Sequence, residues 1–162
     1  MATVVASGCP WNAAGTTGCE PVGPPSPLPE VIHESSGIAP SLTLPGVLWT
    51  HNDGPAPTLY AVDEDGKLLA TIPLTGVQMR DWEDLATGPC EGGSCLYLAD
   101  TGDNTEVRPQ LQLLRIREPD SLDGSPLEAQ SFPIILPDGP RDIEALFILP
   151  GEEIHLVTKG RN

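Results

Sequence analysis

An acidic signature occurs twice in the chain, first as Arg80-Asp81-Trp82-Glu83-Asp84 and again as Arg141-Asp142-Ile143-Glu144. If equivalent segments of a repeated fold surround one axis, Glu83 and Glu144 project toward the same space. Carboxylates that converge repel one another unless a cation or a proton lies between them. The sequence therefore predicts a hard cation with oxygen ligands, most simply calcium, at Glu83, Asp84 and Glu144.

A second acidic cluster is Asp100-Thr101-Gly102-Asp103-Asn104, and His51-Asn52-Asp53-Gly54 holds the equivalent place earlier in the chain. A glycine among oxygen-bearing side chains resembles a calcium loop, although the spacing is not that of an EF-hand. The candidate metal ligands in these two segments are Asp100, Asp103, Asn104, Asn52 and Asp53. Two alternatives stay open: the residues form Asx turns without an ion, or they contact an organic ligand directly.

Three basic residues are candidates for ligand binding. Arg80 and Arg141 could hold a phosphate or a carboxylate through paired hydrogen bonds, and pairing with acids of the adjacent blade is the alternative. His51 lies within the acidic segments, but the scattered histidines predict surface or turn positions rather than a metal site built from histidines. No catalytic residue is assigned, because Ser35-Ser36-Gly37 lacks the surroundings of a nucleophile elbow.

The elements that must position these residues recur along the chain. Three units open at Ser36–Ala39, Glu83–Ala86 and Glu144–Phe147, and each reaches a second apolar run roughly ten residues later. Those second runs are Val47–Asp53, Leu96–Asp100 and Ile154–Lys159. A period of about fifty residues is typical of β-propeller blades rather than helical solenoids.

The remaining apolar runs predict two further strands in each complete unit. They are short and bounded by Pro, Gly, Asn and Asp, which indicates strands. In the first unit Thr58–Val62 and Leu68–Leu74 flank Asp65-Gly66, a strong hairpin signal. The second unit repeats the plan with Leu111–Ile116 and Phe132–Leu136. Four antiparallel strands make one propeller blade, and a β-sandwich of short strands is the alternative. Trp49 and Trp82 are expected to pack in the core between units.

This pattern divides the chain into a leader with a Pro-rich linker, residues 1–29, and a partial β-propeller, residues 30–162. The predicted blades span approximately 30–78, 79–139 and 140–162, and the third is incomplete. Closed propellers usually have four to eight blades. We therefore expect either a truncated chain, with the remaining blades supplied by a longer polypeptide, or two halves that close one ring.

Composition and cysteine spacing limit the possible partners and compartments. The 23 acidic and 8 basic residues disfavour binding to nucleic acid, and no apolar run is long enough for a transmembrane segment. The cysteines predict the disulfides Cys9–Cys19 and Cys90–Cys95 and thus an oxidising compartment. Their spacing is unlike that of structural zinc sites. A lipoprotein is an alternative, because Ala6-Ser7-Gly8-Cys9 resembles a lipid-attachment site.

Four segments carry a resemblance to a known family. They are Ser36–Ser41, Leu48–Asp53, Asp81–Ala86 and Tyr97–Asn104. Together they resemble a mostly uncharacterised family of secreted bacterial six-bladed β-propellers, which is similar to the phytase-like and the YWTD or NHL propellers. The resemblance spans about Glu34 to Asn162 and implies that this chain is about half of a six-bladed ring.

The resemblance implies a secreted, periplasmic or cell-surface protein. Phytase-like propellers bind calcium ions in an acidic channel and hydrolyse phosphate esters, but the few basic residues here provide no phosphate-holding cluster. We therefore expect a propeller that binds a small molecule or a protein, with a structural calcium ion. The alternatives are a calcium-dependent phosphoesterase and a purely structural cell-surface module.

Overall fold

The computed structural model describes residues 3–4, 7–8, 20–21, 23–54 and 56–160. These residues form β-strands joined by turns and extended segments, and no helix occurs among them. The described part of the chain therefore has no helix that is long and apolar enough to cross a membrane. The predicted Cys9–Cys19 disulfide lies outside the described residues, and so does Cys9 as the residue that would carry a lipid in the alternative interpretation.

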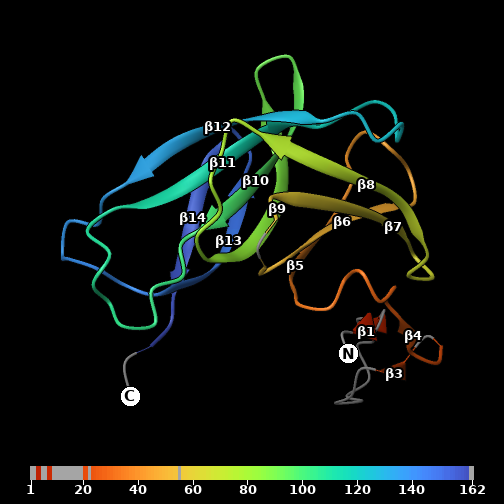
Figure 1. Cartoon of the computed structure of the whole chain (residues 1–162), viewed down its shortest axis with the longest axis horizontal. Coiled ribbons are helices and arrows are strands. Elements are labelled where there is room, and N and C mark those ends of the chain that lie inside the picture. Colours follow the sequence, from red (N-terminus) through yellow and green to blue (C-terminus); the bar gives the residue numbers. More distant parts are fainter. Residues whose placement is uncertain (1–2, 5–6, 9–19, 22, 55, 161–162) are drawn as a thin grey trace, which may run out of the picture.

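The all-β prediction is confirmed (Figure 1). The short N-terminal strands are β1 (Thr3–Val4), β2 (Ser7–Gly8), β3 (Glu20–Pro21) and β4 (Ser26–Pro27). The first long group is β5 (Ser35–Pro40), β6 (Val47–Asn52), β7 (Thr58–Asp63) and β8 (Leu68–Thr75). The second is β9 (Trp82–Cys90), β10 (Gly93–Asp100), β11 (Leu111–Arg117) and β12 (Leu127–Ile134), followed by β13 (Ile143–Leu149) and β14 (Glu153–Thr158).

Each long group pairs in sequence order with antiparallel neighbours. We call β5–β8 the first unit, β9–β12 the second unit and the antiparallel hairpin β13–β14 the third unit. A short parallel contact, Leu127 with Leu74 and Glu128 with Thr75, joins β12 to β8 and links the first two units into one eight-stranded sheet. The opposite ends of that sheet, β5 and β9, also lie against each other, so the sheet nearly closes on itself.

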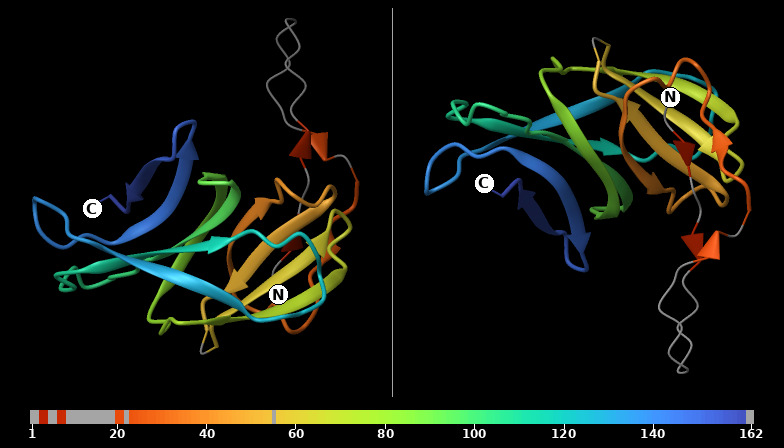
Figure 2. Two further views of the ribbon diagram at one scale, coloured as in Figure 1. Left: turned by 90° about the horizontal axis from the view of Figure 1, so that it is seen from above. Right: turned by 90° about the horizontal axis from the view of Figure 1, so that it is seen from below.

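The opening strands of the three units lie side by side. β9 contacts β5 on one side and β13 on the other, and Figure 2 shows the third unit packed beside the second. This arrangement places the starts of β9 and β13, which carry the repeated acidic signature, next to each other.

Two local predictions can be compared with the structure. The turn at Asp65-Gly66 joins β7 to β8, and Gly66 has a φ of 81°, the left-handed conformation that favours glycine there. The sequence predicts the fourth strand of the second unit at Phe132–Leu136, whereas the strand spans Leu127–Ile134. It begins earlier because its first residues pair with β8 and the following ones with β11, long-range contacts that hydropathy does not indicate.

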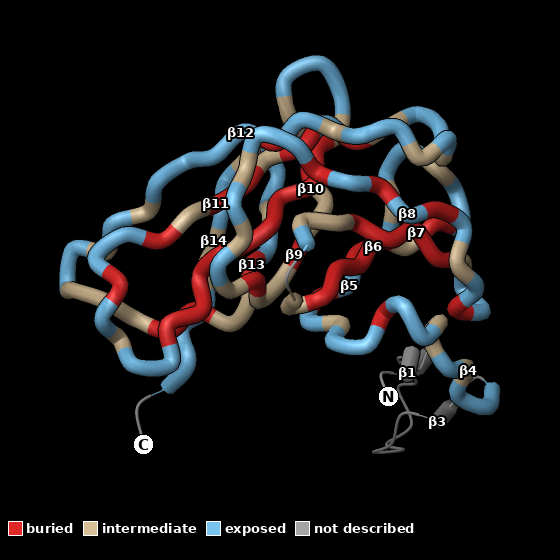
Figure 3. The backbone as a smooth tube through the Cα atoms, in the orientation of Figure 1, coloured by how far each residue is buried: buried red, intermediate tan, exposed pale blue. Residues whose placement is uncertain are grey.

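The core lies between the first and second units. Trp49 and Trp82 are fully buried there, as predicted. Around them pack Leu59, Ala61 and Ile72 of the first unit and Leu96, Leu98, Leu114 and Ile116 of the second. Figure 3 shows that burial is concentrated in the middle strands, whereas the connecting loops are mostly exposed. Burial of this apolar surface is the main term that stabilises the two units against each other.

A buried carboxylate also connects these units. Glu118, at the end of β11, accepts hydrogen bonds from Trp49 Nε1 (2.9 Å), Thr43 Oγ1 (3.0 Å) and Leu42 N (3.1 Å) of the first unit, and from Ser41 Oγ. Burial alone would raise the pKa of Glu118, but hydrogen bonds from side chains including Ser41 and Trp49 lower it below its usual value. The ionised form of Glu118 is therefore the stabilising one.

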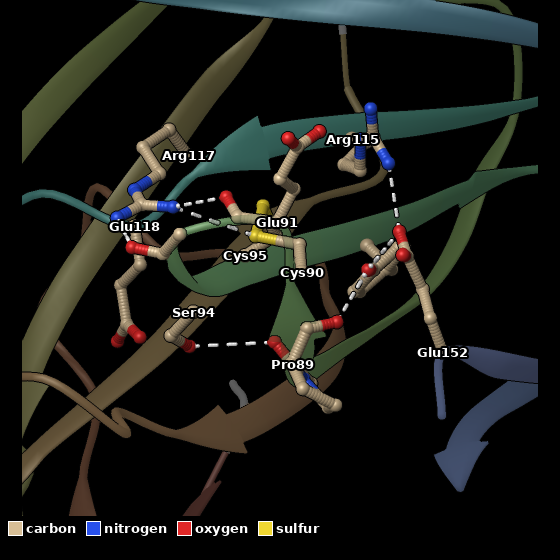
Figure 4. The surroundings of a disulfide bond; sticks show 12 residues. Pro89, Cys90, Glu91, Ser94, Cys95, Arg115, Arg117, Glu118 and Glu152 are labelled. Carbon is tan, nitrogen blue, oxygen red and sulfur yellow. Dashed lines mark hydrogen bonds and ion pairs between the residues drawn. A yellow bond between two sulfur atoms is a disulfide. The ribbon is translucent and has the colours of Figure 1, made fainter. Parts of the chain in front are cut away.

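The Cys90–Cys95 disulfide forms as predicted, with 5.8 Å between the two Cα atoms. It closes the turn between β9 and β10 (Figure 4). Arg117 donates hydrogen bonds to the carbonyl oxygens of Glu91 (2.9 Å) and Gly92 in the same turn. The disulfide and the guanidinium together fix the conformation of this loop.

We expect the Cys90→Ser, Cys95→Ser double variant to lose about 2 kcal/mol of stability, because so short a loop removes little chain entropy from the unfolded state. Faster amide exchange and new proteolytic cleavage should be confined to residues 88–95, as measured by mass spectrometry. Glu91→Gln, which changes an exposed side chain of the same turn and keeps the disulfide, is the control. A digestion pattern identical to that of the wild type would contradict a rigidifying role.

We expect Glu118→Ala to lower the free energy of unfolding by about 3 kcal/mol, because the indole N–H of Trp49 would remain buried without its acceptor. The contribution of Glu118 should be lost as pH falls through its lowered folded-state pKa, since the ionised form is the one bound. Urea denaturation measures both effects. Glu128→Ala on exposed β12 is the control, and equal losses in the two variants would refute the assignment.

Candidate functional site

Three carboxylates converge where the second and third units meet. Glu83 lies near the start of β9, Glu144 near the start of β13, and Asp142 immediately before β13. One carboxylate oxygen from each lies within 4.8 Å of the others. Glu83 and Glu144 thus meet as the sequence predicts, and the reason is that β9 and β13 are packed together. We call Glu83, Asp142 and Glu144 the acidic cluster.

A lysine partly neutralises the acidic cluster. Lys159, just after β14, places its Nζ 2.8 Å from Glu144 Oε1 and 3.5 Å from Asp142 Oδ2. The hydrogen bond to Glu144 raises the pKa of Lys159 and keeps the ammonium charged. Lys159 is exposed, so it can leave without opening the core. The acidic cluster therefore binds a cationic side chain at a position that is open to solvent.

The acidic cluster makes ionisation of Glu83 unfavourable. Burial raises the pKa of Glu83 to about 7, and the charges of Glu144, Asp81, Asp53 and Asp142 add to the effect. The pKa of Asp81 is also raised, first by burial and then by Asp53, with Arg108 acting in the opposite direction. Near neutral pH Glu83 is thus poised between its protonated and ionised forms, and a bound cation would favour the ionised form.

Gly102, in the loop after β10, lies against the carboxyl groups of Glu83 and Asp81. A Cβ atom at Gly102 would overlap Glu83 Oε1 and the carboxyl group of Asp81, so any other residue would displace these side chains. The Gly102 N–H donates to the carbonyl oxygen of Asp81 at 3.2 Å. The loop after β10 therefore packs tightly against the acids, and only glycine allows that approach.

Asp100 holds the backbone segment that leads into β9. The Asp100 side chain is fully buried and accepts hydrogen bonds from the backbone N–H groups of Arg80 (3.1 Å) and Asp81 (3.2 Å). It also forms an ion pair with Arg108 Nη2 at 3.0 Å. Arg108 Nη1 also donates to the Gly102 carbonyl oxygen at 2.6 Å. These bonds occupy the Asp100 carboxylate, so its observed role is to fix the entry to β9.

Asp103 and Asn104 have different positions. The Asp103 N–H donates to Asp142 Oδ1 at 2.8 Å, and Asp103 Oδ2 accepts from the Arg108 N–H at 2.7 Å. Asp103 therefore orients Asp142 from the neighbouring loop. Asn104 is exposed and lines a cleft of about 240 Å³ together with Asp142 and Lys159. Asp142 is thus the member of the acidic cluster that borders this cleft.

Asp84 lies apart from the acidic cluster, although it is adjacent to Glu83 in sequence. Its carboxylate accepts hydrogen bonds from Leu85 N (2.8 Å) and from Leu146 N of β13 (2.9 Å). Burial raises the pKa of Asp84 while these two hydrogen bonds oppose that shift. The side chain thus connects the backbones of two units, and it is not among the three carboxylates that meet.

The two predicted metal ligands of the first unit, Asn52 and Asp53, also differ in their surroundings. Asn52 is buried, accepts from the Glu34 N–H (3.1 Å) and donates to the Val31 carbonyl oxygen (2.9 Å). Its amide fixes the segment before β5. Asp53 is partly exposed, and its charge acts on Glu83 and Asp81.

The three predicted ligand-binding residues do not share one environment. The prediction of a surface or turn position is wrong for His51: it lies within β6 and is fully buried, edge-on to Trp82 with 5.7 Å between ring centroids. Burial lowers the pKa of His51 to about 4 and keeps it neutral. Arg141 forms an ion pair with Asp138 at 2.8 Å, so an acid already occupies the guanidinium that was a candidate for phosphate binding. The Arg80 side chain is exposed, just before β9.

Sequence reasoning missed several residues at this site. Asp142 was visible as the repeated Asp of the Arg-Asp-x-Glu signature, and its equivalence with Asp81 was the available signal. Lys159 and Arg108 gave no such signal, because each reaches the site through contacts with segments distant in sequence. Comparisons of the chain with protein families, with curated proteins and with solved structures found no match.

The acidic cluster fits the ligand chemistry of a hard cation. Calcium takes oxygen ligands at about 2.3–2.6 Å, so two ligands on opposite sides of the ion lie about 5 Å apart. The 4.8 Å limit on the cluster meets this requirement. Because Gly102 has no side chain, the carboxyl groups of Glu83 and Asp81 can occupy the position that its Cβ atom would take. An ion there would lie where the Lys159 ammonium now offsets the charge.

In calcium-free buffer we expect Glu83→Gln to be more stable than the wild type at pH 8 by about 1 kcal/mol, the modest size reflecting solvent screening. The raised pKa means that Glu83 stabilises the fold fully below its ordinary pKa of 4.5 and loses this contribution as pH rises through about 7. Urea denaturation between pH 4 and 8 measures the difference. The exposed Glu64→Gln variant is the control, and parallel curves for all three proteins would contradict the prediction.

Proposed function

We propose that the chain is part of a β-propeller in which the first, second and third units are successive blades. Two observations support this. The first two units are four-stranded antiparallel meanders in sequence order, and β9, which opens the second unit, contacts the opening strands of the first and third units, β5 and β13. In a propeller the opening strands surround the central axis. The acidic cluster would then face the channel, as the resemblance to six-bladed propellers implies.

We further propose that Glu83, Asp142 and Glu144 bind a calcium ion. The observation that carries this proposal is their convergence from two adjacent blades within 4.8 Å of one another. Such an ion would replace Lys159 as the counter-charge of Glu144 and Asp142. It would bridge the second and third units and favour the ionised form of Glu83.

The proposed role of the domain is to bind a small molecule or a protein outside the cytoplasm, with calcium as a structural ion. The Cys90–Cys95 disulfide supports an oxidising compartment. Calcium at the junction of two blades would fix the loops of the channel mouth, including the one with Asn104. We do not favour the phosphoesterase alternative, because Arg141 is tied to Asp138 and Arg108 to Asp100.

We expect calcium to raise the thermal stability of the wild type relative to a sample with chelator. At about a hundred times the Kd the stabilisation is about 2.7 kcal/mol, because the ion binds only the folded state. Differential scanning calorimetry with and without calcium measures this, and isothermal titration gives the Kd directly. Asp142→Asn and Glu144→Gln should abolish the response and Glu64→Gln should retain it. Identical melting curves with calcium and chelator would refute the proposal.

A further inference from the structure

The third unit differs from the other two at its second strand. In the first unit β6 pairs with β5 and β7, and in the second β10 pairs with β9 and β11. Within the part of the chain that the structure describes, β14 pairs with β13 alone. Because side chains alternate along a strand, Ile154 and Leu156 face one side of the hairpin and Val157 the other. Apolar residues on both faces are typical of a strand in the middle of a sheet.

A cleft of about 400 Å³ opens beside β14, between the second and third units. Its walls include Tyr97, Leu113 and Phe132 of the second unit and Ile154 of β14. Phe132 and Ile154 are 39% and 38% exposed. The open edge of β14 and the apolar cleft are thus continuous.

The interface between the first and second units shows how such a cleft is filled. There the third and fourth strands of the first unit, β7 and β8, place Leu59, Ala61 and Ile72 against Leu114 and Ile116 of the second unit. The corresponding interface between the second and third units contains Tyr97 of β10, Leu113 of β11 and Leu146 of β13, and no third or fourth strand of the third unit is present among the described residues. The cleft marks the place where equivalents of β7 and β8 would lie.

The polar groups of the cleft already have partners. Arg115 donates to Glu152 Oε1 (2.7 Å) and Gln130 Oε1 (3.0 Å) and lies over the Phe132 ring, 5.0 Å from its centroid. Tyr97 Oη donates to the Pro89 carbonyl oxygen (2.9 Å) or to Glu152 Oε1 (2.8 Å). Figure 4 shows Arg115 and Glu152 facing each other across the two units. The occupant therefore needs an apolar face rather than a charge.

We propose that β14 takes an antiparallel β-hairpin that completes the third unit and covers this cleft. The strand next to β14 forms the backbone ladder, and alternate small or branched apolar side chains of the hairpin pack on Phe132, Leu113 and Ile154. This inference rests on the blade equivalence proposed above. Pairing of β14 with β14 of a second copy would leave Phe132 uncovered, and the net charge of −15 on each copy opposes such pairing.

The test uses a synthetic peptide of residues Thr58–Thr75, the β7–β8 hairpin of this chain, labelled with a fluorophore. We expect saturable binding to the whole protein by fluorescence anisotropy. Bound peptide should slow amide exchange in β14 without affecting β6, which is already paired on both sides. A scrambled peptide of the same composition is the negative probe.

Two variants locate the binding site. Ile154→Lys and Phe132→Lys should each weaken peptide binding at least tenfold, because each places a charge in the apolar cleft. Leu69→Lys on β8, a residue as exposed as Phe132, should bind as the wild type does. Near-UV circular dichroism confirms that each variant is folded, and two variants keep the test valid if one does not fold.

The inference is overturned if the hairpin peptide binds no better than the scrambled one, or if Leu69→Lys weakens binding as much as Ile154→Lys. It is also overturned if light scattering shows a dimer whose formation protects β14 without peptide, since the occupant would then be a second copy. Binding by the Glu83→Gln variant in chelator separates this result from the calcium proposal. If this variant binds the peptide as the wild type does, and the wild type shows no stabilisation by calcium, the calcium proposal is rejected and the hairpin-binding site is retained.

Discussion

Close approach of the opening strands is the constraint on which the rest of the structure depends. β9 contacts both β5 and β13, so there is no room for large side chains where these strands meet. A Cβ atom at Gly37 of β5 would collide with Asp84 and with the backbone of Leu85. Asp84 in turn accepts the Leu146 N–H of β13. One glycine and one carboxylate thus set the spacing of three units through backbone contacts.

The alternation of side chains along β9 explains why neighbouring acids have different fates. Glu83 faces the acidic cluster, whereas Asp84 binds backbone N–H groups. On one face of β9 the carboxylate of Glu83 is therefore close to other negative charges, whereas on the other face the carboxylate of Asp84 binds the backbone of β13. Lys159 pairs with Glu144 and Asp142, whereas burial and, to a smaller extent, the neighbouring carboxylates raise the pKa of Glu83.

Local pattern was sufficient for most of the strands and for the convergence of Glu83 and Glu144, because short apolar runs and a repeat are recorded directly in the sequence. It was insufficient where long-range contacts decide the outcome. Asp100 looks like a loop ligand in sequence, but the distant Arg80 N–H and Arg108 occupy it. His51 looks like a surface residue, yet it packs against Trp82 from another unit. Neither partner can be inferred from the neighbouring residues.

The short parallel contact between β8 and β12 has a consequence for how the molecule loses structure. With β5 against β9 at one end and β8 bonded to β12 at the other, the first two units enclose one core. Neither can separate without exposing Trp49 and Trp82, so they should open as one cooperative block. The β13–β14 hairpin contributes two buried apolar side chains, Ile143 and Leu146, far fewer than either of the other units. Opening of this hairpin should therefore precede global unfolding and define the least stable cooperative element among the long strands.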